Sequence, residues 1–64
     1  MTEETIKKAD ALIGKTFNYN RKNIVIERYK EVSGTNLVFF DNQSRIICNI
    51  YCTELDDFIE NLFE

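Results

Sequence analysis

The chain has 64 residues, of which 44% are hydrophobic and 30% are charged, and its 8 basic and 11 acidic residues give a net charge of −3 at pH 7. This length excludes a second domain, so we expect residues 1–64 to form one small domain that buries little surface. The net negative charge argues against strong non-specific binding to polyanions. The absence of histidine removes the side chain that most often acts as a catalytic base.

The first predicted element is a helix over residues 2–13. Thr2 or Thr5 can cap its start. The apolar residues that recur at helical spacing are Ile6, Ala9 and Ile13, with Leu12 beside them. Because this stripe holds few large side chains, we expect the helix to cover little of the core. Gly14 follows, where helices commonly end in a left-handed residue.

Gly14, Lys15 and Thr16 match the end of the phosphate-binding loop of nucleotide hydrolases. The first glycine of that motif would fall at Ala9, so the motif is incomplete. Its context is also reversed, because the loop requires a strand before it and a helix after it. We therefore predict no nucleotide site here, and we interpret the stretch as the end of a helix and the start of a strand.

Alternation of apolar and polar residues predicts four strands after the helix, starting at residue 16 and then at 23–32, 37–40 and 45–52. Turn-forming residues separate them at 20–23, 33–36 and 41–44. In the second strand Ile24 and Ile26 share one face, whereas Tyr29 falls on the face of Val25. A β-bulge or a strong twist near residues 27 and 28 would reconcile the two halves.

The last predicted element is an amphipathic helix over residues 53–63. Its apolar stripe consists of Leu55, Phe58, Ile59 and Leu62. The predicted fold class is therefore α+β: a four-stranded antiparallel β-meander with an N-terminal helix and a C-terminal amphipathic helix, in the order α-β-β-β-β-α.

The predicted sheet has more apolar residues than two helices can cover. We expect the C-terminal helix to cover the face that carries Ile24, Ile26, Ile46, Cys48 and Ile50. The other face then holds Phe39 or Phe40 with Val25, Tyr29, Ile47 and Tyr51, and only the first helix remains to cover it. This surplus predicts a partner, most simply a second copy related by a two-fold axis. The residues predicted for self-association are Phe39, Phe40, Ile47 and Tyr51.

The two cysteines, Cys48 and Cys52, are not expected to form a disulfide. Four residues along a strand separate their Cα atoms by about 13 Å, which is too far for a disulfide. Two cysteines without histidine cannot complete a zinc site, so we expect no metal and no cofactor. No signal peptide or membrane-spanning run is recognisable, so we expect no membrane contact. The free thiols favour a cytoplasmic location.

Charges of opposite sign are segregated along the chain. The acidic residues Asp56, Asp57 and Glu60 of the last helix are interpreted as a contact face for a basic partner or as an ordinary solvated face. Cations and aromatics alternate across the first strands, as in sheets that bind single-stranded nucleic acid. The candidate nucleic-acid strip consists of Tyr19, Arg21, Lys22, Arg28, Tyr29 and Lys30; its alternative is the solvated rim of a curved sheet.

The sequence shows no catalytic constellation, so we predict that the protein is not an enzyme. The favoured hypothesis is a small intracellular protein that acts by protein–protein interaction, such as a phage or mobile-element inhibitor or regulator of a host system. The alternative is a dimeric module that binds single-stranded nucleic acid. In its order of strands and helix the chain resembles small single-stranded-DNA-binding coactivator domains, which dimerise.

Overall fold

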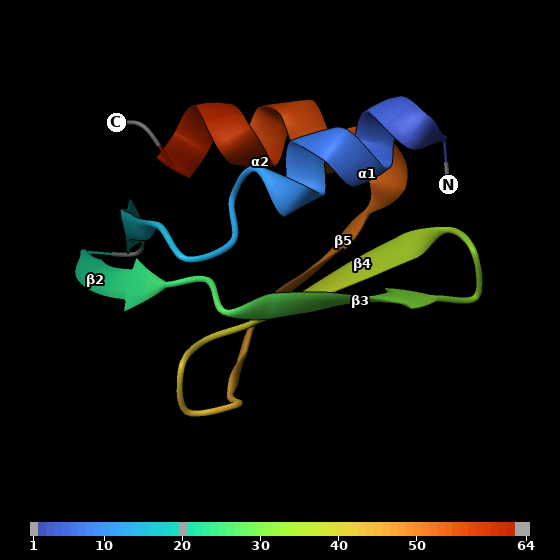
Figure 1. Ribbon diagram of the computed structural model, residues 1–64. Helices are drawn as coiled ribbons and strands as arrows, with labels where there is room; N and C mark the ends of the chain where they lie inside the picture. Colours follow the sequence, from blue (N-terminus) through green and yellow to red (C-terminus); the bar gives the residue numbers. More distant parts are fainter. Residues whose placement is uncertain (1, 20, 63–64) are drawn as a thin grey trace.

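The computed structural model describes residues 2–19 and 21–62, so Asn20 in the predicted first turn and Phe63 at the end of the predicted last helix lie outside the described residues. The described elements are helix α1 (Glu3–Asp10), strands β1 (Thr16–Tyr19), β2 (Lys22–Val25), β3 (Arg28–Val32), β4 (Asn36–Phe40) and β5 (Ile46–Tyr51), a 3-10 helix (Cys52–Glu54) and helix α2 (Leu55–Leu62) (Figure 1). The predicted α+β class, with a helix at each end and antiparallel strands between, is confirmed.

The strands form two antiparallel sheets, β1-β2 and β3-β4-β5, and the predicted four-stranded meander is therefore imprecise. The predicted strand at 23–32 is divided because its two halves pair with different partners. The Ile26 N–H donates to the Lys15 carbonyl, at 3.3 Å, and the next amide, of Glu27, donates to the Phe40 carbonyl, at 2.9 Å. The chain thus passes from one sheet to the other between these two residues.

The division of the strand explains the shift in its apolar pattern. Phe40 is the register partner of Arg28, and its carbonyl also accepts the N–H of Glu27. Glu27 and Arg28 thus both lie opposite Phe40, as two residues do in a β-bulge. The extra residue turns Tyr29 toward the same core that Ile24 and Ile26 contact. The break therefore lies where the sequence pattern required one.

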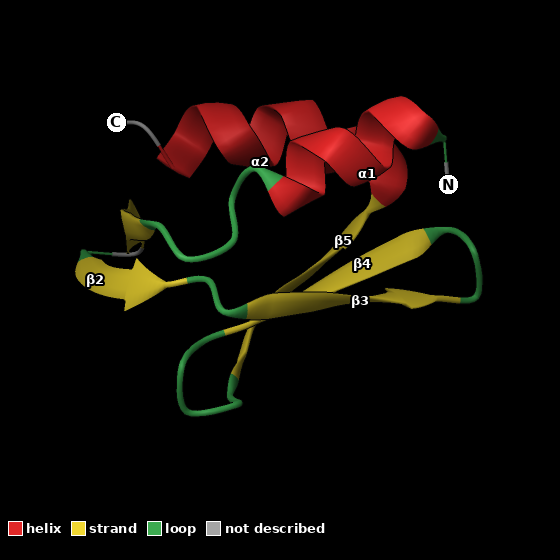
Figure 2. Ribbon diagram, in the orientation of Figure 1, coloured by secondary structure: helices red, strands yellow, loops and turns green. Residues whose placement is uncertain are grey.

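Both helices lie on the same side of the three-stranded sheet (Figures 1 and 2). Tyr29 of β3 and Phe39 of β4 are register partners and share a face. Tyr29 donates a hydrogen bond to Asp10 of α1, and Phe39 stacks on Phe58 of α2. The expectation that α1 covers the opposite face is wrong, because α1 contacts Tyr29 on the covered face and Asp56 of α2.

The core lies between the helices, the β1-β2 hairpin and the covered face of β3-β4-β5. Phe39, Ile26 and Leu37 are its largest fully buried side chains. The buried cluster consists of Leu12, Phe17, Ile26, Leu37, Phe39, Leu55, Phe58 and Leu62. The Cα radius of gyration is 10.8 Å, close to the roughly 11 Å of a compact chain of this length. Both sheets and both helices therefore belong to one body.

The two faces of the sheet carry a different set of residues from the predicted one. Cys48 and Ile50 lie opposite Phe39 and Leu37 on the covered face, as expected for the two β5 residues. Tyr29 also lies on the covered face, contrary to prediction, and of the two alternatives Phe39 and Phe40 it is Phe40 that lies on the other face. Ile46 lies opposite Phe40 on the other face, because the register shifts between Phe39 and Phe40.

Candidate binding surfaces

The face of β3-β4-β5 that lies opposite the helices is not covered by any described element, and we call it the open face (Figure 1). Because side chains alternate along a strand, the register assigns every second residue to this face. These residues are Arg28, Lys30 and Val32 of β3, Asn36, Val38 and Phe40 of β4, and Ile46, Asn49 and Tyr51 of β5. None of the nine is acidic, although the chain has a net charge of −3.

Apolar surface on the open face is concentrated on β5. Ile46 and Tyr51, at the two ends of that strand, are 66% and 60% exposed. Val38, in the middle of the central strand, is only 7% exposed, and Val32 on β3 is 38% exposed. Ile46 and Tyr51 are therefore the most exposed apolar side chains of the open face.

The positive charge of the open face is carried by β3. The Arg28 guanidinium lies over the Phe40 ring, with Cζ 4.0 Å from the ring centroid, in a cation–π contact. Lys30 lies on the same face of the same strand, two residues further on, and is exposed. Because no carboxylate shares this face, the local charge is positive.

The residues predicted for self-association are not all at the surface. Phe39 has no exposed surface and belongs to the core, so it cannot contact a partner in this fold. Ile47 is half-buried and packs against the core cluster. Phe40 and Tyr51 do lie on the open face. Two of the four residues thus lie on one face of the sheet, and the other two contribute to the core or pack against it.

The predicted nucleic-acid strip is divided between two sides of the molecule. Tyr19 packs edge-on against Phe58, with centroids 5.9 Å apart, and desolvation by burial raises its pKa. Tyr29 donates a 2.6 Å hydrogen bond to Asp10, which raises the Tyr29 pKa to about 12. Both tyrosines therefore face the helix layer, whereas Arg28 and Lys30 face away from it. The remaining pair, Arg21 and Lys22, lies on the β1-β2 hairpin.

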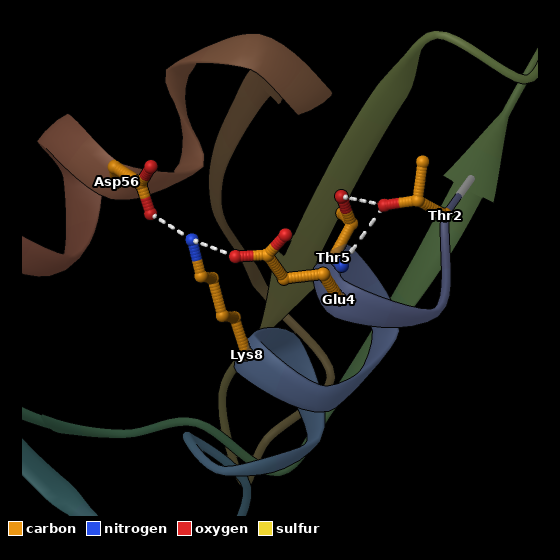
Figure 3. A network of polar contacts seen from close by, with 5 residues as sticks. All are labelled: Thr2, Glu4, Thr5, Lys8 and Asp56. Atoms are coloured by element: carbon orange, nitrogen blue, oxygen red, sulfur yellow. Dashed lines mark hydrogen bonds and ion pairs between the residues drawn. The ribbon is translucent and has the colours of Figure 1, made fainter.

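The predicted acidic contact face on α2 is partly neutralised within the molecule. Lys8 of α1 donates to Asp56 at 2.7 Å and also pairs with Glu4 at 3.3 Å (Figure 3). The hydrogen bond to Asp56 raises the pKa of Lys8. Asp57 and Glu60 are exposed. Asp56 thus forms an exposed ion pair between the two helices, and the other two carboxylates of the predicted face remain toward solvent.

A groove of about 450 Å³ lies between β2 and the turn that joins β4 to β5, and the sequence pattern did not indicate it. It is lined by Tyr19, Lys22, Asn23, Ile24, Val25, Asp41, Asn42, Arg45, Ile46 and Ile47. It forms because the chain leaves β1-β2 at residue 26, so that β2 and the start of β5 face each other without pairing. Its residues come from distant parts of the chain, which explains why no local motif marks it.

The turn that forms one wall of the groove is fixed by Asp41. One carboxylate oxygen, Oδ1, accepts the amides of Gln43 and Arg45, each at 2.9 Å, and Oδ2 accepts Nε of Arg45 at 3.2 Å. The hydrogen bond from the Arg45 amide is the main cause that lowers the Asp41 pKa. Asp41 is thus a structural residue whose charge is already compensated.

Cys48 and Cys52 are free and half-buried. Desolvation by burial raises the pKa of the Cys48 thiol to about 11, so it is protonated at neutral pH. Within residues 2–19 and 21–62, no group of three or more acidic or cysteine side chains is arranged to hold a metal ion. In the same described part of the chain, neither helix has the length and apolar character needed to cross a membrane.

Comparison of the chain with protein-family models, with curated proteins and with solved structures found no significant match. The open face, the groove and their charges are therefore the features that bear on function.

Proposed function

We propose that this protein acts without catalysis, by binding another protein through the open face of β3-β4-β5. The observation that carries the proposal is the position of both helices on the opposite side of the sheet, which leaves Ile46 and Tyr51 protruding. Exposed apolar side chains on an otherwise polar surface are typical of interaction sites, and tyrosine is enriched at such sites. Binding through this face would be sufficient for a protein that inhibits or regulates its partner.

The charge of the open face defines the chemistry of the partner. Arg28 and Lys30 are exposed, and no carboxylate lies among the nine residues of the face. An acidic segment that also carries apolar side chains would complement both the cations and the protruding Ile46 and Tyr51. We therefore propose an acidic, partly apolar stretch of protein as the ligand.

A second copy of the chain fits the open face less well than a different protein. A two-fold axis that runs across the strands would bring Arg28 and Lys30 of each copy toward those of the other, and like charges across an interface cost several kcal/mol. A homodimer would therefore need a different axis or another surface, and sedimentation at micromolar concentration tests the predicted homodimer directly.

Non-catalytic action is supported by the state of the potential reactive groups. The chain has no histidine, and the Cys48 thiol has a raised pKa of about 11, so it is a poor nucleophile at neutral pH. The shifted pKa values of Tyr29 and Asp41 arise from hydrogen bonds within the fold. We also propose a cytoplasmic location, which suits the two free cysteines.

A second candidate function is binding of single-stranded nucleic acid. Lys30 and Tyr51 on an uncovered sheet favour it, because such proteins combine cations with stacking aromatics. The positions of the other aromatics weaken it: Tyr19 and Tyr29 face the helices, and Arg28 covers the Phe40 ring. Among the described residues of the open face, Tyr51 alone offers a largely exposed ring for stacking.

Selection from a displayed library of random peptides of about twelve residues tests the proposal. We expect acidic peptides with aromatic or aliphatic side chains, and we expect their addition to shift the NMR signals of Lys30, Ile46 and Tyr51. The double variant R28E/K30E should lose these peptides and select basic ones instead. The control K7E reverses the charge of one exposed residue of α1, on the helix side of the sheet, and should behave as the wild type.

Two results would overturn the proposal. One is selection of no peptide, or of peptides whose NMR shifts lie on the helix side alone. The other is salt-dependent binding of oligo-dT at about 50 mM salt that is lost in R28E/K30E, which would establish the nucleic-acid alternative.

A further inference from the structure

The groove beside β2 contains a strand edge with free backbone groups. In an antiparallel ladder, residues alternate between those that bond to the partner strand and those whose N–H and C=O point away. The Ile26 N–H donates to the carbonyl of Lys15, the residue before β1. The backbone N–H and C=O groups of Ile24 and Lys22 therefore also point toward β1. The N–H and C=O groups of Asn23 and Val25 therefore point away from β1, and both residues line the groove. Among residues 2–19 and 21–62, no backbone partner is found for these two.

The two edge strands of the three-stranded sheet are less suited to accept a strand. On β5, Glu54 already accepts the N–H of Tyr51, at 2.9 Å, and the register shift interrupts the other end. The edge strand β3 carries Arg28, Lys30 and Glu31, and charged side chains of this kind protect natural sheet edges against pairing. The β2 edge carries one charged side chain, Lys22, at the start of the strand, and Asn23 and Val25 lie in a hollow.

The charges of the groove favour an anionic ligand. Lys22 is exposed and forms no ion pair with the described residues, and the Arg45 guanidinium uses only Nε to bind Asp41. The carboxylate of Asp41 is occupied by two backbone amides and Arg45, so it offers little negative charge to a ligand. The groove volume of about 450 Å³ is in the usual range for ligand sites.

We infer that an acidic stretch of the partner protein enters this groove in an extended conformation and adds as a strand to the free edge of β2. Its backbone pairs with Asn23 and Val25, and its carboxylates lie toward Lys22 and Arg45. Ile46 belongs both to the groove and to the open face, so one ligand can occupy the two surfaces. This inference rests on the proposed function, and it places the acidic part of the ligand in the groove beside β2.

Proline substitution tests strand addition without changing any charge. Val25→Pro removes an N–H that points into the groove, and proline is tolerated on the free edge of a strand. The matched control Asn18→Pro removes an outward N–H from the free edge of β1, away from the groove. With an acidic peptide selected against the wild type, we expect V25P to weaken binding about tenfold, which corresponds to one backbone hydrogen bond. N18P should bind as the wild type.

NMR of the peptide complex supplies a second measurement. We expect the amide hydrogens of Asn23 and Val25 to exchange more slowly in the complex, and K22E to bind more weakly than the wild type. The inference is overturned if V25P binds as tightly as N18P or if the two amides stay unprotected. In that case retained shifts at Tyr51 and Lys30 would show that the open-face proposal still stands.

A small anion is the other kind of ligand that Lys22 and Arg45 could bind. Titration with inorganic phosphate alone distinguishes it. Saturable shifts of the groove residues with phosphate, together with no protection of Asn23 and Val25 by any selected peptide, would replace the strand by a small-anion site. If no peptide binds at all, the proposed function itself fails, which is a different result from failure at the groove.

Discussion

Tyr29 shows how one side chain can lose a predicted function and gain a structural one. Its hydroxyl donates to Asp10 at 2.6 Å, and its ring lies 6.0 Å from that of Phe39, centroid to centroid. It therefore joins strand β3 to helix α1. A tyrosine in this position is not available to stack on a nucleic-acid base.

The Tyr29 hydrogen bond predicts a dependence of stability on high pH. The folded-state pKa is raised from 10.0 to about 12, so the stabilisation is complete below pH 10 and is lost as the pH rises toward 12. We expect Y29F to lower the free energy of unfolding by about 1 kcal/mol at neutral pH. The difference from wild type should shrink above pH 10, as measured by urea unfolding.

Spectrophotometric titration of the tyrosines gives an independent check on Tyr29. The transition near pH 12 should be absent in Y29F and should move to lower pH in D10A. The control Y51F removes an exposed tyrosine and should leave that transition in place. An unchanged high-pH transition in Y29F would contradict the assignment.

At the scale of elements, the turn between β3 and β4 holds the three-stranded sheet in register. Ser33 and Gly34 both have positive φ, at 55° and 68°, and the Thr35 amide donates to the Val32 carbonyl at 3.2 Å. Two consecutive left-handed residues are typical of the tight turns that match the twist of a hairpin. The position of Gly34 therefore requires a residue that tolerates this conformation.

Substitution of Gly34 tests this requirement. A Cβ at Gly34 would meet only a Glu31 side-chain oxygen at 3.9 Å, so the cost comes from the backbone conformation and not from a clash. We expect G34A to lower the free energy of unfolding by about 1 kcal/mol. G34N should lose less, because asparagine adopts the left-handed conformation more readily. Equal stability of G34A and wild type in urea unfolding would refute the argument.

At the scale of the whole molecule, Phe58 connects the two sheets to helix α2. Its ring stacks on Phe39 of β4, with centroids 5.0 Å apart, and contacts the edge of Tyr19 of β1 at 5.9 Å. Since β1-β2 and β3-β4-β5 share no pairing, such side-chain contacts bind them into one body. The stability of the fold should therefore depend strongly on this one residue.

Truncation of Phe58 should remove a large part of the stability of the fold. Replacing a buried phenylalanine by alanine costs about 3–5 kcal/mol, and a domain of this size has roughly 3–10 kcal/mol in total. F58L, which keeps more of the volume, should cost about 1.5 kcal/mol. Calorimetry or urea unfolding measures both. The control N61A changes an exposed residue of the same helix, and its free energy of unfolding should stay within about 0.5 kcal/mol of the wild-type value. A similarly small effect of F58A would contradict the role of Phe58.

Local chemistry allowed several features to be predicted from the sequence. Thr2 does cap the first helix, accepting the Thr5 amide at 3.2 Å, although that helix ends at Asp10 and not at residue 13. Gly14 has the left-handed φ expected of it, 81°. The apolar stripe of Leu55, Phe58 and Leu62 is buried, and the phase shift near Glu27 marks a real break. Each of these depends on neighbours a few residues away.

Tertiary structure alone decided which residues form the two binding surfaces. The register shift between Phe39 and Phe40 places Ile46 on the open face, and alternation along a single strand cannot reveal a shift that depends on the partner strand. The side covered by α1 depends on its contacts with Tyr29 and Asp56. Periodicity determined which residues share a face, but pairing and packing between distant segments determined which face is covered.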